Sequence, residues 1–281
     1  MKTWLIVILI AVLAAVAYYF YDQQTAVPEP PVVEAPPELP APMPESELET
    51  EPLPEPVPET PLPLESMEEP LADVEPLPPL EQSDPLAEES LRELLGEQTV
   101  QRYFETDDLI PRAVAMVDAL AAQQVPGSVA IVRSPPGEFE ATADERPAEV
   151  IRNEQGDAIP QYVLDPVNYE RYEPYVAMLE AVEPEQAGAT FERHYPLLQE
   201  AFRQMGYTDA DFEDRLTTVI DELLATPELE EPPRLIKPEA YYLFADPELE
   251  ALSAGQKILL RMGPENAARV KARLREIRQA L

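Results

Sequence analysis

The chain has 281 residues, 45% of them hydrophobic, which is enough for one or two domains. Its formal net charge of −35 excludes nucleic acid as a partner, because binding a phosphate polymer requires a positive surface that releases counterions. Cysteine is absent, which excludes disulfides, thiolate nucleophiles and metal sites with cysteine ligands.

Residues 1–22 have the pattern of a transmembrane anchor. Residues 4–21 read "WLIVILIAVLAAVAYYFY", eighteen residues without a charge. A helix of that length reaches roughly 27 Å, close to the hydrocarbon thickness of about 30 Å. Trp4 and the tyrosines at the other end of the run match the aromatic belts of membrane helices. Lys2 and the amino terminus are the only positive charges nearby, so we expect the N-terminus to be cytoplasmic.

A cleaved signal peptide is the alternative interpretation of the same residues. Ala15, Val16 and Ala17 form a small-x-small pattern after the apolar run, and cleavage would then follow Ala17. The aromatic residues that continue past Ala17 favour an anchor that is not cleaved. Both interpretations carry the rest of the chain across the membrane.

Residues 23–89 have the composition of a disordered linker. Residues 27–89 contain 19 prolines, 16 glutamates and 2 aspartates, and no lysine or arginine occurs from residue 3 to residue 91. Proline removes backbone donors and unpaired carboxylates repel one another, so this Pro/Glu-rich stretch cannot form a packed core. Its reach is roughly 50 Å as a coil and about 190 Å when fully extended. We expect a stalk; an inert tether and a proline-rich ligand for an aromatic groove are the alternatives.

Residues 90–281 are expected to fold as one domain with a net charge of −17. A chain of this length buries about 70% of its unfolded surface. Ser90 and Glu93 form a capping-box pattern that predicts a helix start, and Gly96 interrupts that helix. Helical periodicity predicts further helices at 109–121, 166–182 with a bend or split at Pro174, 191–205 closed by Gly206, 212–224, 253–261 and 264–281.

A minor β element is predicted between residues 128 and 164. Turn residues bracket a short apolar run at 129–132, and "NEQGD" at 153–157 separates two further candidate strands, 149–152 and 162–164. Residues 241–244 also have an extended pattern. The predicted fold class is therefore a mainly α-helical domain with a minor β element (α+β).

Four strings carry a resemblance to a known family: "NYERY" (168–172), "YPLLQEAFRQMGY" (195–207), "LLATPEL" (223–229) and "LEALSAGQKILLRMGPENAARVKARLREI" (249–277). They resemble the pattern of a bacterial envelope family known only as domain of unknown function number 3014, and the resemblance covers residues 90–281. It implies a membrane-anchored protein of Gram-negative-type bacteria with the folded domain in the periplasm. The family has no assigned activity, so the resemblance implies no catalytic residues.

Two sets of side chains form the candidate binding surface. The first is the aromatic and hydrogen-bonding cluster of Asn168, Tyr169, Arg171 and Tyr172, suited to a sugar or a peptide; the second is Arg269 and Arg273, on a basic C-terminal helix suited to an anionic partner. Each set has a structural alternative. The first would be a buried corner that satisfies backbone groups, and the second would neutralise the domain's own acids.

Three other patterns are interpreted as structural, so we expect no cofactor and no metal. His194 is the only histidine, which excludes sites with several histidine ligands. "AGQK" at 254–257 lacks the glycine spacing of a phosphate loop, and a helix N-cap at Ser253 explains it. "TDADFED" at 208–214 lacks the twelve-residue calcium loop, and a helix start capped by Thr208 or Asp209 explains it.

The sequence therefore predicts a non-catalytic, single-pass inner-membrane protein whose bulk is periplasmic. We expect a binding or adaptor function, in which an extended acidic stalk displays a helical domain to an envelope protein or a cell-wall partner. The alternative is an enzyme that acts on cell-wall or other envelope glycan through paired carboxylates, since such catalysis needs only two carboxyl groups at the right separation.

Overall fold

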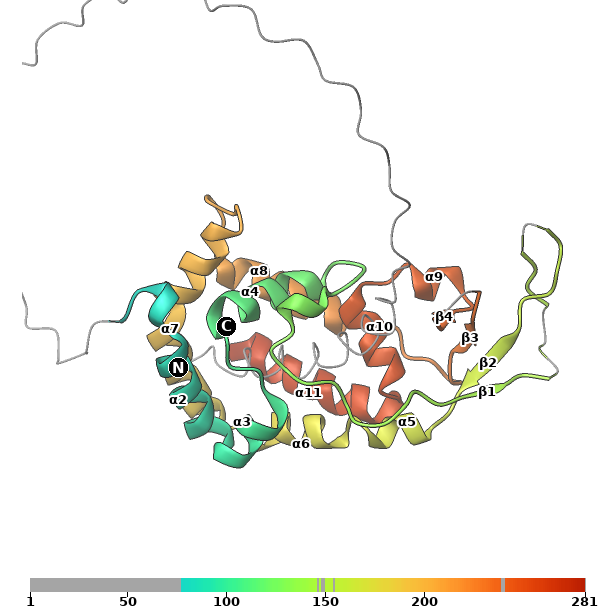
Figure 1. Ribbon diagram of the computed structural model, residues 1–281, viewed down its shortest axis with the longest axis horizontal. Coiled ribbons are helices and arrows are strands. Elements are labelled where there is room, and N and C mark those ends of the chain that lie inside the picture. Colours follow the sequence, from blue (N-terminus) through green and yellow to red (C-terminus); the bar gives the residue numbers. More distant parts are fainter. Residues whose placement is uncertain (1–76, 146, 148–149, 154, 239–240, 281) are drawn as a thin grey trace, which may run out of the picture. The chain divides into compact units, whose positions relative to one another are not determined.

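The computed structural model describes residues 77–145, 147, 150–153, 155–238 and 241–280 (Figure 1). The predicted anchor, residues 1–22, and all but the last residues of the predicted linker lie outside the described residues. Within these ranges, no helix is long and apolar enough to cross a membrane.

Helices dominate the described part of the chain, as predicted. They are η1 (Leu80–Gln82), α2 (Asp84–Leu95), α3 (Glu97–Tyr103), α4 (Leu109–Leu120), η2 (Gly127–Val129), α5 (Val167–Glu170), α6 (Glu173–Ala181), α7 (Pro184–Gln204), α8 (Phe212–Leu224), α9 (Pro247–Glu250), α10 (Ala254–Arg261) and α11 (Pro264–Ala280). Four short strands form the minor β element: β1 (Ala141–Ala143), β2 (Gln161–Leu164), β3 (Arg234–Ile236) and β4 (Leu243–Phe244). The α+β prediction is confirmed for these residues.

The larger core lies among the helices. α4 packs against α7 and α8, α11 packs against α6 and α8, and α2 packs against α4 and α7. Their apolar faces bury a continuous cluster whose largest side chains include Met116, Tyr175, Phe202 and Phe212. The spacing of these apolar residues along each helix is what places them on one face.

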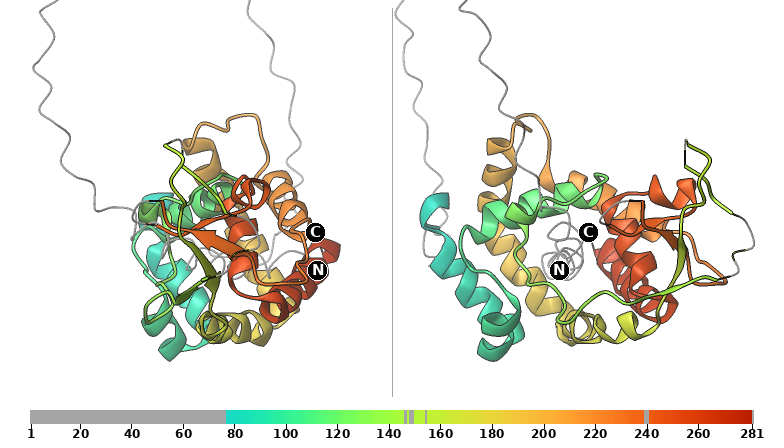
Figure 2. Two further views of the ribbon diagram at one scale, coloured as in Figure 1. Left: turned by 90° about the vertical axis from the view of Figure 1, so that its right-hand side faces the viewer. Right: turned by 45° about the vertical axis from the view of Figure 1, so that its right-hand side comes forward.

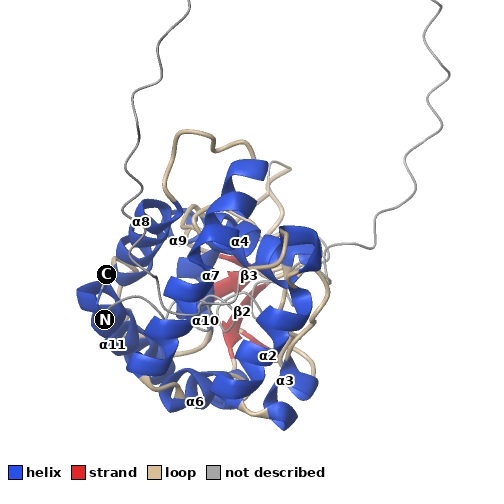
Figure 3. Cartoon of the chain, turned by 90° about the vertical axis from the view of Figure 1, so that its left-hand side faces the viewer, coloured by secondary structure: helices blue, strands red, loops and turns tan. Residues whose placement is uncertain are grey.

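The sheet has its own small core. The strands are all antiparallel in the order β1-β2-β3-β4, with Tyr162 opposite Leu235 and Leu235 opposite Phe244. One face of the sheet buries Leu164, Leu235 and Phe244 against Leu260 of α10. The left-hand view of Figure 2 shows this sheet end of the domain toward the viewer, and the strands lie behind the helices when the domain is viewed from the other end (Figure 3).

The folded part begins before the predicted boundary at Ser90. Leu80 and Ala87 belong to the buried helical core, and Ser90 is a buried residue inside α2 rather than its N-cap. Asp84 and Pro85 open the helix instead, because proline fits the first turn, where its missing N–H is not needed. The Asp84 carboxylate also accepts hydrogen bonds of 2.8 Å from the backbone N–H groups of Asp108 and Leu109, at the start of α4.

The predicted helices at 109–121, 212–224, 253–261 and 264–281 agree with the structure to within about one residue, but α7 begins at Pro184, well before the predicted start at residue 191. The predicted strands are confirmed only in part. Pro174 splits the predicted long helix into α5 and α6, and Gly206 follows α7 with a φ of 106°. The predicted strand 162–164 lies within β2, and residues 241–244 contain β4. The predicted strand 129–132 is wrong, because Val129 belongs to η2 and Val132 makes only an isolated bridge with Phe104. Of the predicted strand 149–152, residue 149 lies outside the described residues, and Arg152 makes an isolated bridge with Ala158.

Candidate functional site

Asn168, the first residue of the predicted binding surface, is fully buried at the start of α5. Its amide oxygen accepts a 3.0 Å hydrogen bond from the backbone N–H of Glu140. Its amide nitrogen donates to the backbone oxygens of Glu140 and Asp165, both at 2.7 Å. Asn168 therefore ties the segment before β1 to α5, and its polar atoms are occupied within the protein.

Arg171 and Tyr172 have the same kind of role. The Arg171 guanidinium donates to the backbone oxygens of Pro135, Pro136 and Gly137 at 3.0 to 3.2 Å. Tyr172 is 1% exposed. These contacts match the structural alternative, a buried corner in which a guanidinium and an amide satisfy backbone groups.

Arg269 and Arg273 lie on α11, where they contact α6 and the residue that follows it. Arg269 donates to both carboxylate oxygens of Glu180 at 2.7 and 2.9 Å, and it forms an ion pair with Glu173 at 2.8 Å. The hydrogen bond from Arg269 lowers the pKa of Glu180 below its ordinary value. Arg273 donates to the Val182 carbonyl at 2.7 Å. Both arginines thus serve the domain's own acids and carbonyls, as the structural alternative predicted.

Tyr169 is the predicted residue that faces a cavity. Its ring packs against Gly263 so closely that a Cβ at that glycine would meet ring atoms at 2.6 to 2.8 Å. Its backbone oxygen accepts a 2.9 Å hydrogen bond from Asn266, which ties α5 to α11, the helix that carries Arg269 and Arg273. Burial, together with the Asp165 carboxylate, raises the pKa of Tyr169.

Tyr169 lines a cleft between the loop that joins α8 to β3, residues 226–233, and the helices α10 and α11. The cleft has a volume of about 280 Å³. Its floor is apolar, with Leu229, Leu260 and Ala267 beside the tyrosine. In Figure 1 α10 lies near the sheet, and α11 runs from there across the domain toward the end where α2 lies. We call this cavity the α8–β3 cleft.

Lys271 closes one end of the α8–β3 cleft. The residue is 4% exposed, and its ammonium donates to the Thr226 backbone oxygen at 2.6 Å. Thr226 follows the last turn of α8, so Lys271 complements the negative end of that helix. A second contact, with the Glu228 carboxylate at 3.5 Å, joins the lysine to the lip of the cleft.

The lip of the α8–β3 cleft is acidic. Glu228, Glu230 and Glu231 line it, and all three are exposed. Glu230 and Glu231 make no ion pair with any residue that the structure describes. The cleft therefore combines an apolar floor with a carboxylate lip, which suits a ligand that is apolar at its centre and cationic at its edge.

Sequence reasoning missed this cleft, although a local signal was present. The loop reads "TPELEEPP" from residue 226 to residue 233, with prolines on both sides of a segment that holds three glutamates and Leu229. Proline fixes φ and stiffens such a loop, and glutamates on a stiff loop that faces two helices form a lip. What the sequence does not contain is the approach of α10 and α11, which supplies the floor.

His194 stands in a different environment, a small cavity of about 50 Å³ between α2, α4 and α7. Its Nδ1 lies 2.6 Å from the Thr190 backbone oxygen, and its Nε2 lies 3.5 Å from the Ser90 hydroxyl. Burial lowers the pKa of His194. The cavity is otherwise lined mostly by aliphatic side chains. The Thr190 carbonyl fixes the imidazole within this lining, which fits a structural role for His194.

The two remaining patterns are helix starts, as predicted. Ser253 and Gln256 form a reciprocal capping box at the start of α10. In the acidic segment 208–214 the cap is Asp211, rather than Thr208 or Asp209, and its carboxylate also accepts the Tyr195 hydroxyl at 2.7 Å. In the described part of the chain, no group of three or more histidine, aspartate or glutamate side chains could hold a metal ion.

A comparison with protein families finds a match for most of the described domain. Residues 109–278 match the profile of DUF3014, described as a protein of unknown function. No curated protein and no solved structure matches the chain. The match covers more than half of the 281 residues and contains every element from α4 to the body of α11. The chain therefore belongs to the DUF3014 family of proteins of unknown function.

Proposed function

We propose that the chain is a membrane-tethered adaptor of the bacterial envelope. Residues 1–22 would anchor it in the inner membrane with the N-terminus in the cytoplasm. The Pro/Glu-rich segment would act as an extended acidic stalk, and the helical domain would bind another envelope component in the periplasm. No catalysis is assigned to it.

The α8–β3 cleft is the observation that supports a binding function. It is a concave site with apolar walls and a few charged groups at its edge, which is the usual composition of a recognition site. Asn168, Arg171, Arg269 and Arg273 all donate hydrogen bonds to groups of the protein itself. Recognition through the cleft is thus better supported than recognition through the residues that the sequence suggested.

The test is site-specific photocrosslinking of the full-length chain in intact cells. A photoreactive amino acid replaces Ala268, an exposed residue of α11 that lines the α8–β3 cleft. The matched control carries the same group at Glu89, an exposed residue of α2 at the other end of the domain. We expect one dominant envelope protein to be crosslinked from position 268 and not from position 89. Equal patterns from both positions would contradict the proposal.

The topology has its own test. A reporter that is active only in the cytoplasm, fused to the C-terminus, should be inactive if the bulk of the chain is periplasmic. An active reporter would reverse the proposed orientation and would remove the envelope partner with it. The same fusion at the N-terminus is the matched control and should be active.

The glycan-hydrolysing alternative has one observation in its favour. Asp211 and Asp214 line an open depression of about 450 Å³ beside the turn between α7 and α8. Glu213 stands between these two residues in the sequence but does not line the depression. Burial, with the neighbouring Asp211 and Asp214 carboxylates, raises the pKa of Glu213, and a raised carboxyl pKa is what a general acid requires. Incubation of the full-length chain with purified cell-wall glycan, with Glu213→Gln as the control, would reveal this activity as new reducing ends that the variant does not produce.

A further inference from the structure

We propose that the α8–β3 cleft binds a peptide segment of a partner protein in which apolar side chains are flanked by lysine or arginine. This inference rests on the proposed adaptor function, because it names the chemistry of the partner that the adaptor captures. Three features of the cleft favour such a peptide: its size, the charge of its lip and the stiffness of the loop that forms the lip.

The size of the cleft fits part of a peptide. Pockets for whole small molecules usually have volumes of about 300–1,000 Å³. The α8–β3 cleft has about 280 Å³ and is lined by Leu229, Leu260, Ala267 and the Tyr169 ring. It therefore accommodates one or two apolar side chains, while the rest of the segment lies across the lip.

The charge of the lip selects a cationic segment. Lys271, the buried cation of the cleft, already donates to the Thr226 carbonyl and contacts Glu228. Glu230 and Glu231 are exposed and have no ion pair among the described residues. A bound lysine or arginine would be a positively charged partner for these carboxylates. Such complementarity gives specificity and a fast association rate.

Three basic side chains of neighbouring segments interact with other groups of the domain. Arg234, at the end of the loop, pairs with Asp144 at 2.5 Å, and Lys257 of α10 pairs with Glu250 at 3.0 Å. Arg261 donates to the Tyr242 carbonyl at 3.0 Å. The domain also has a net charge of −17 from residue 90 onward, so its long-range field attracts cationic partners to any concave site.

The loop that forms the lip is stiff before anything binds. Pro227, Pro232 and Pro233 all line the cleft, and each fixes its own φ. A stiff loop loses little conformational entropy when a ligand binds to it, which favours binding. The acidic Pro/Glu-rich segment of the same chain and a second copy of this acidic chain would both meet like charge at this lip.

The experiment measures the binding of fluorescent peptides to the full-length chain by anisotropy. The probe is a twelve-residue peptide in which leucine alternates with lysine; the comparison peptides carry glutamate or serine in place of lysine. We expect the lysine peptide to bind, and the affinity to fall as salt is added, because the lip charges are exposed. Tight binding of the glutamate peptide would overturn the proposal and would point to Lys271 and an acidic occupant.

Matched variants separate the cleft from the general acidity of the chain. The triple variant Glu228→Gln, Glu230→Gln, Glu231→Gln should weaken binding of the lysine peptide about fivefold or more, as expected for three exposed charge pairs. The control triple, Glu81→Gln, Glu89→Gln, Glu93→Gln, removes the same charge from exposed positions at the other end of the domain and should leave affinity nearly unchanged. Equal losses in the two triples would overturn the proposal.

Filling the floor gives a second, charge-independent test. Ala268→Trp places a large ring in the cleft from an exposed position on α11 and should abolish binding. Ala189→Trp, at an exposed position on α7, is the control. Unchanged binding in Ala268→Trp would overturn the proposal. Failure of these peptide experiments would leave the adaptor function to be judged by photocrosslinking in cells, so the two proposals can fail separately.

Discussion

The helical end and the sheet end of this domain are stabilised in different ways. The helical end has a large continuous apolar core shared by α2, α4, α7, α8 and α11, whereas the small core under the sheet buries only Leu164, Leu235, Phe244 and Leu260. A sheet of four strands with two to four residues each cannot bury enough apolar surface to hold itself in place. Polar side chains supply the remaining attachments at that end.

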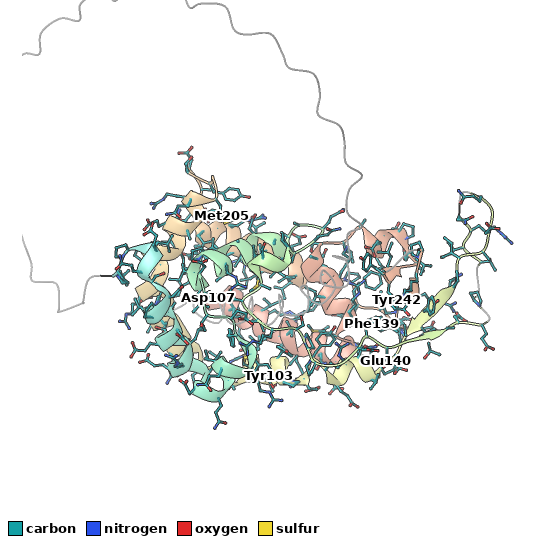
Figure 4. All side chains as sticks on the ribbon, viewed as in Figure 1. Tyr103, Asp107, Phe139, Glu140, Met205 and Tyr242 are labelled. Carbon is teal, nitrogen blue, oxygen red and sulfur yellow. The ribbon has the colours of Figure 1, made fainter. Side chains whose placement is uncertain are left out.

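Asn168 and Arg261 make these polar attachments from buried positions, and Arg171 makes them from a partly exposed one. Asn168 bonds the Glu140 backbone on both sides, and Arg171 bonds three carbonyls of the loop before β1. Arg261 of α10 donates to the Tyr242 carbonyl, and its guanidinium lies 4.7 Å from the centre of the Phe244 ring. Figure 4 shows Phe139, Glu140 and Tyr242 close together at this end. We therefore expect cavities to lower the stability of the helical end most. The loss of hydrogen bonds should instead lower the stability of the sheet end.

The largest effect is expected from Phe202→Ala in the helical core. Phe202 is 1% exposed, and its ring contacts Tyr207 and Phe212 at centroid distances of 4.4 and 5.6 Å. Removing a buried phenylalanine costs about 3–5 kcal/mol of unfolding free energy. Urea denaturation of the full-length chain measures this loss. Amide exchange should show faster opening throughout α4, α7 and α8.

Leu235→Ala makes the same kind of cavity in the small core of the sheet. It should cost about 2–5 kcal/mol locally. We expect faster amide exchange in β2, β3 and β4, with α4, α7 and α8 still protected, because the two cores are separate clusters. Equal acceleration in both ends would show that the domain opens as one unit, and that the two cores do not unfold separately.

The next largest effect is expected from loss of the polar attachments at the sheet end. Asn168→Ala removes a buried amide and leaves the Glu140 N–H and carbonyl without their partner, which costs about 1–3 kcal/mol for an unsatisfied buried group. Asn153→Ala is the control, since its side chain accepts one exposed hydrogen bond, from the Asp157 N–H. We expect the loss of stability, followed by urea denaturation, to be much larger for Asn168→Ala. Similar losses would mean that the buried bonds contribute little to the sheet end.

The third effect concerns Gly263, at the floor of the α8–β3 cleft. Gly263→Ala forces a side chain onto a residue with a φ of 86° and drives its Cβ to 2.6 Å from the Tyr169 ring. Gly206→Ala has a φ of 106° but no atom within 4 Å, so it measures the backbone strain alone, about 1–2 kcal/mol. We expect Gly263→Ala to lose more stability in urea and also to weaken peptide binding. A variant as stable as Gly206→Ala would show that the ring moves aside without cost.

The helices were predictable from sequence because their signals are local. Apolar spacing, Gly206 after α7 and the Ser253–Gln256 capping box all lie within a few residues of the boundary they mark. The strands β1 and β3 were missed because each has three residues and is defined by partners far along the chain. The Val129 to Val132 run resembles a strand in isolation, yet in the fold it ends a short turn of helix and bridges Phe104.

The candidate site was less predictable than the fold for a related reason. Tyrosine, asparagine and arginine can recognise a ligand or satisfy the protein's own backbone, and the sequence does not say which. Asn168 and Arg171 turned out to bond carbonyls about thirty residues away. The α8–β3 cleft exists only because the proline-bounded loop meets α10 and α11, a tertiary contact that no local pattern encodes.

The smallest expected effect is a pH dependence located in the helical end. His194 is buried near Ser90 and the Thr190 carbonyl, and the charge of Arg193 also disfavours protonation. Burial therefore holds the pKa of His194 below its unfolded value of about 6.5. The unfolded chain then takes up a proton that the folded chain does not, so stability should fall as the pH drops through 6.5. The slope is at most about 1.4 kcal/mol per pH unit for one proton.

Because His194 is the only histidine in the chain, one variant isolates this effect. His194→Gln keeps a polar side chain in the same cavity but cannot titrate, so its unfolding free energy in urea should change less between pH 7.5 and 5.5 than that of the wild type. Glu213 has the opposite effect. Its pKa is raised in the folded state, so its protonation in acid increases the unfolding free energy. If His194→Gln and the wild type lose stability in parallel, the acid sensitivity comes from carboxylates, and the buried imidazole is not what makes the helical end sensitive to acid.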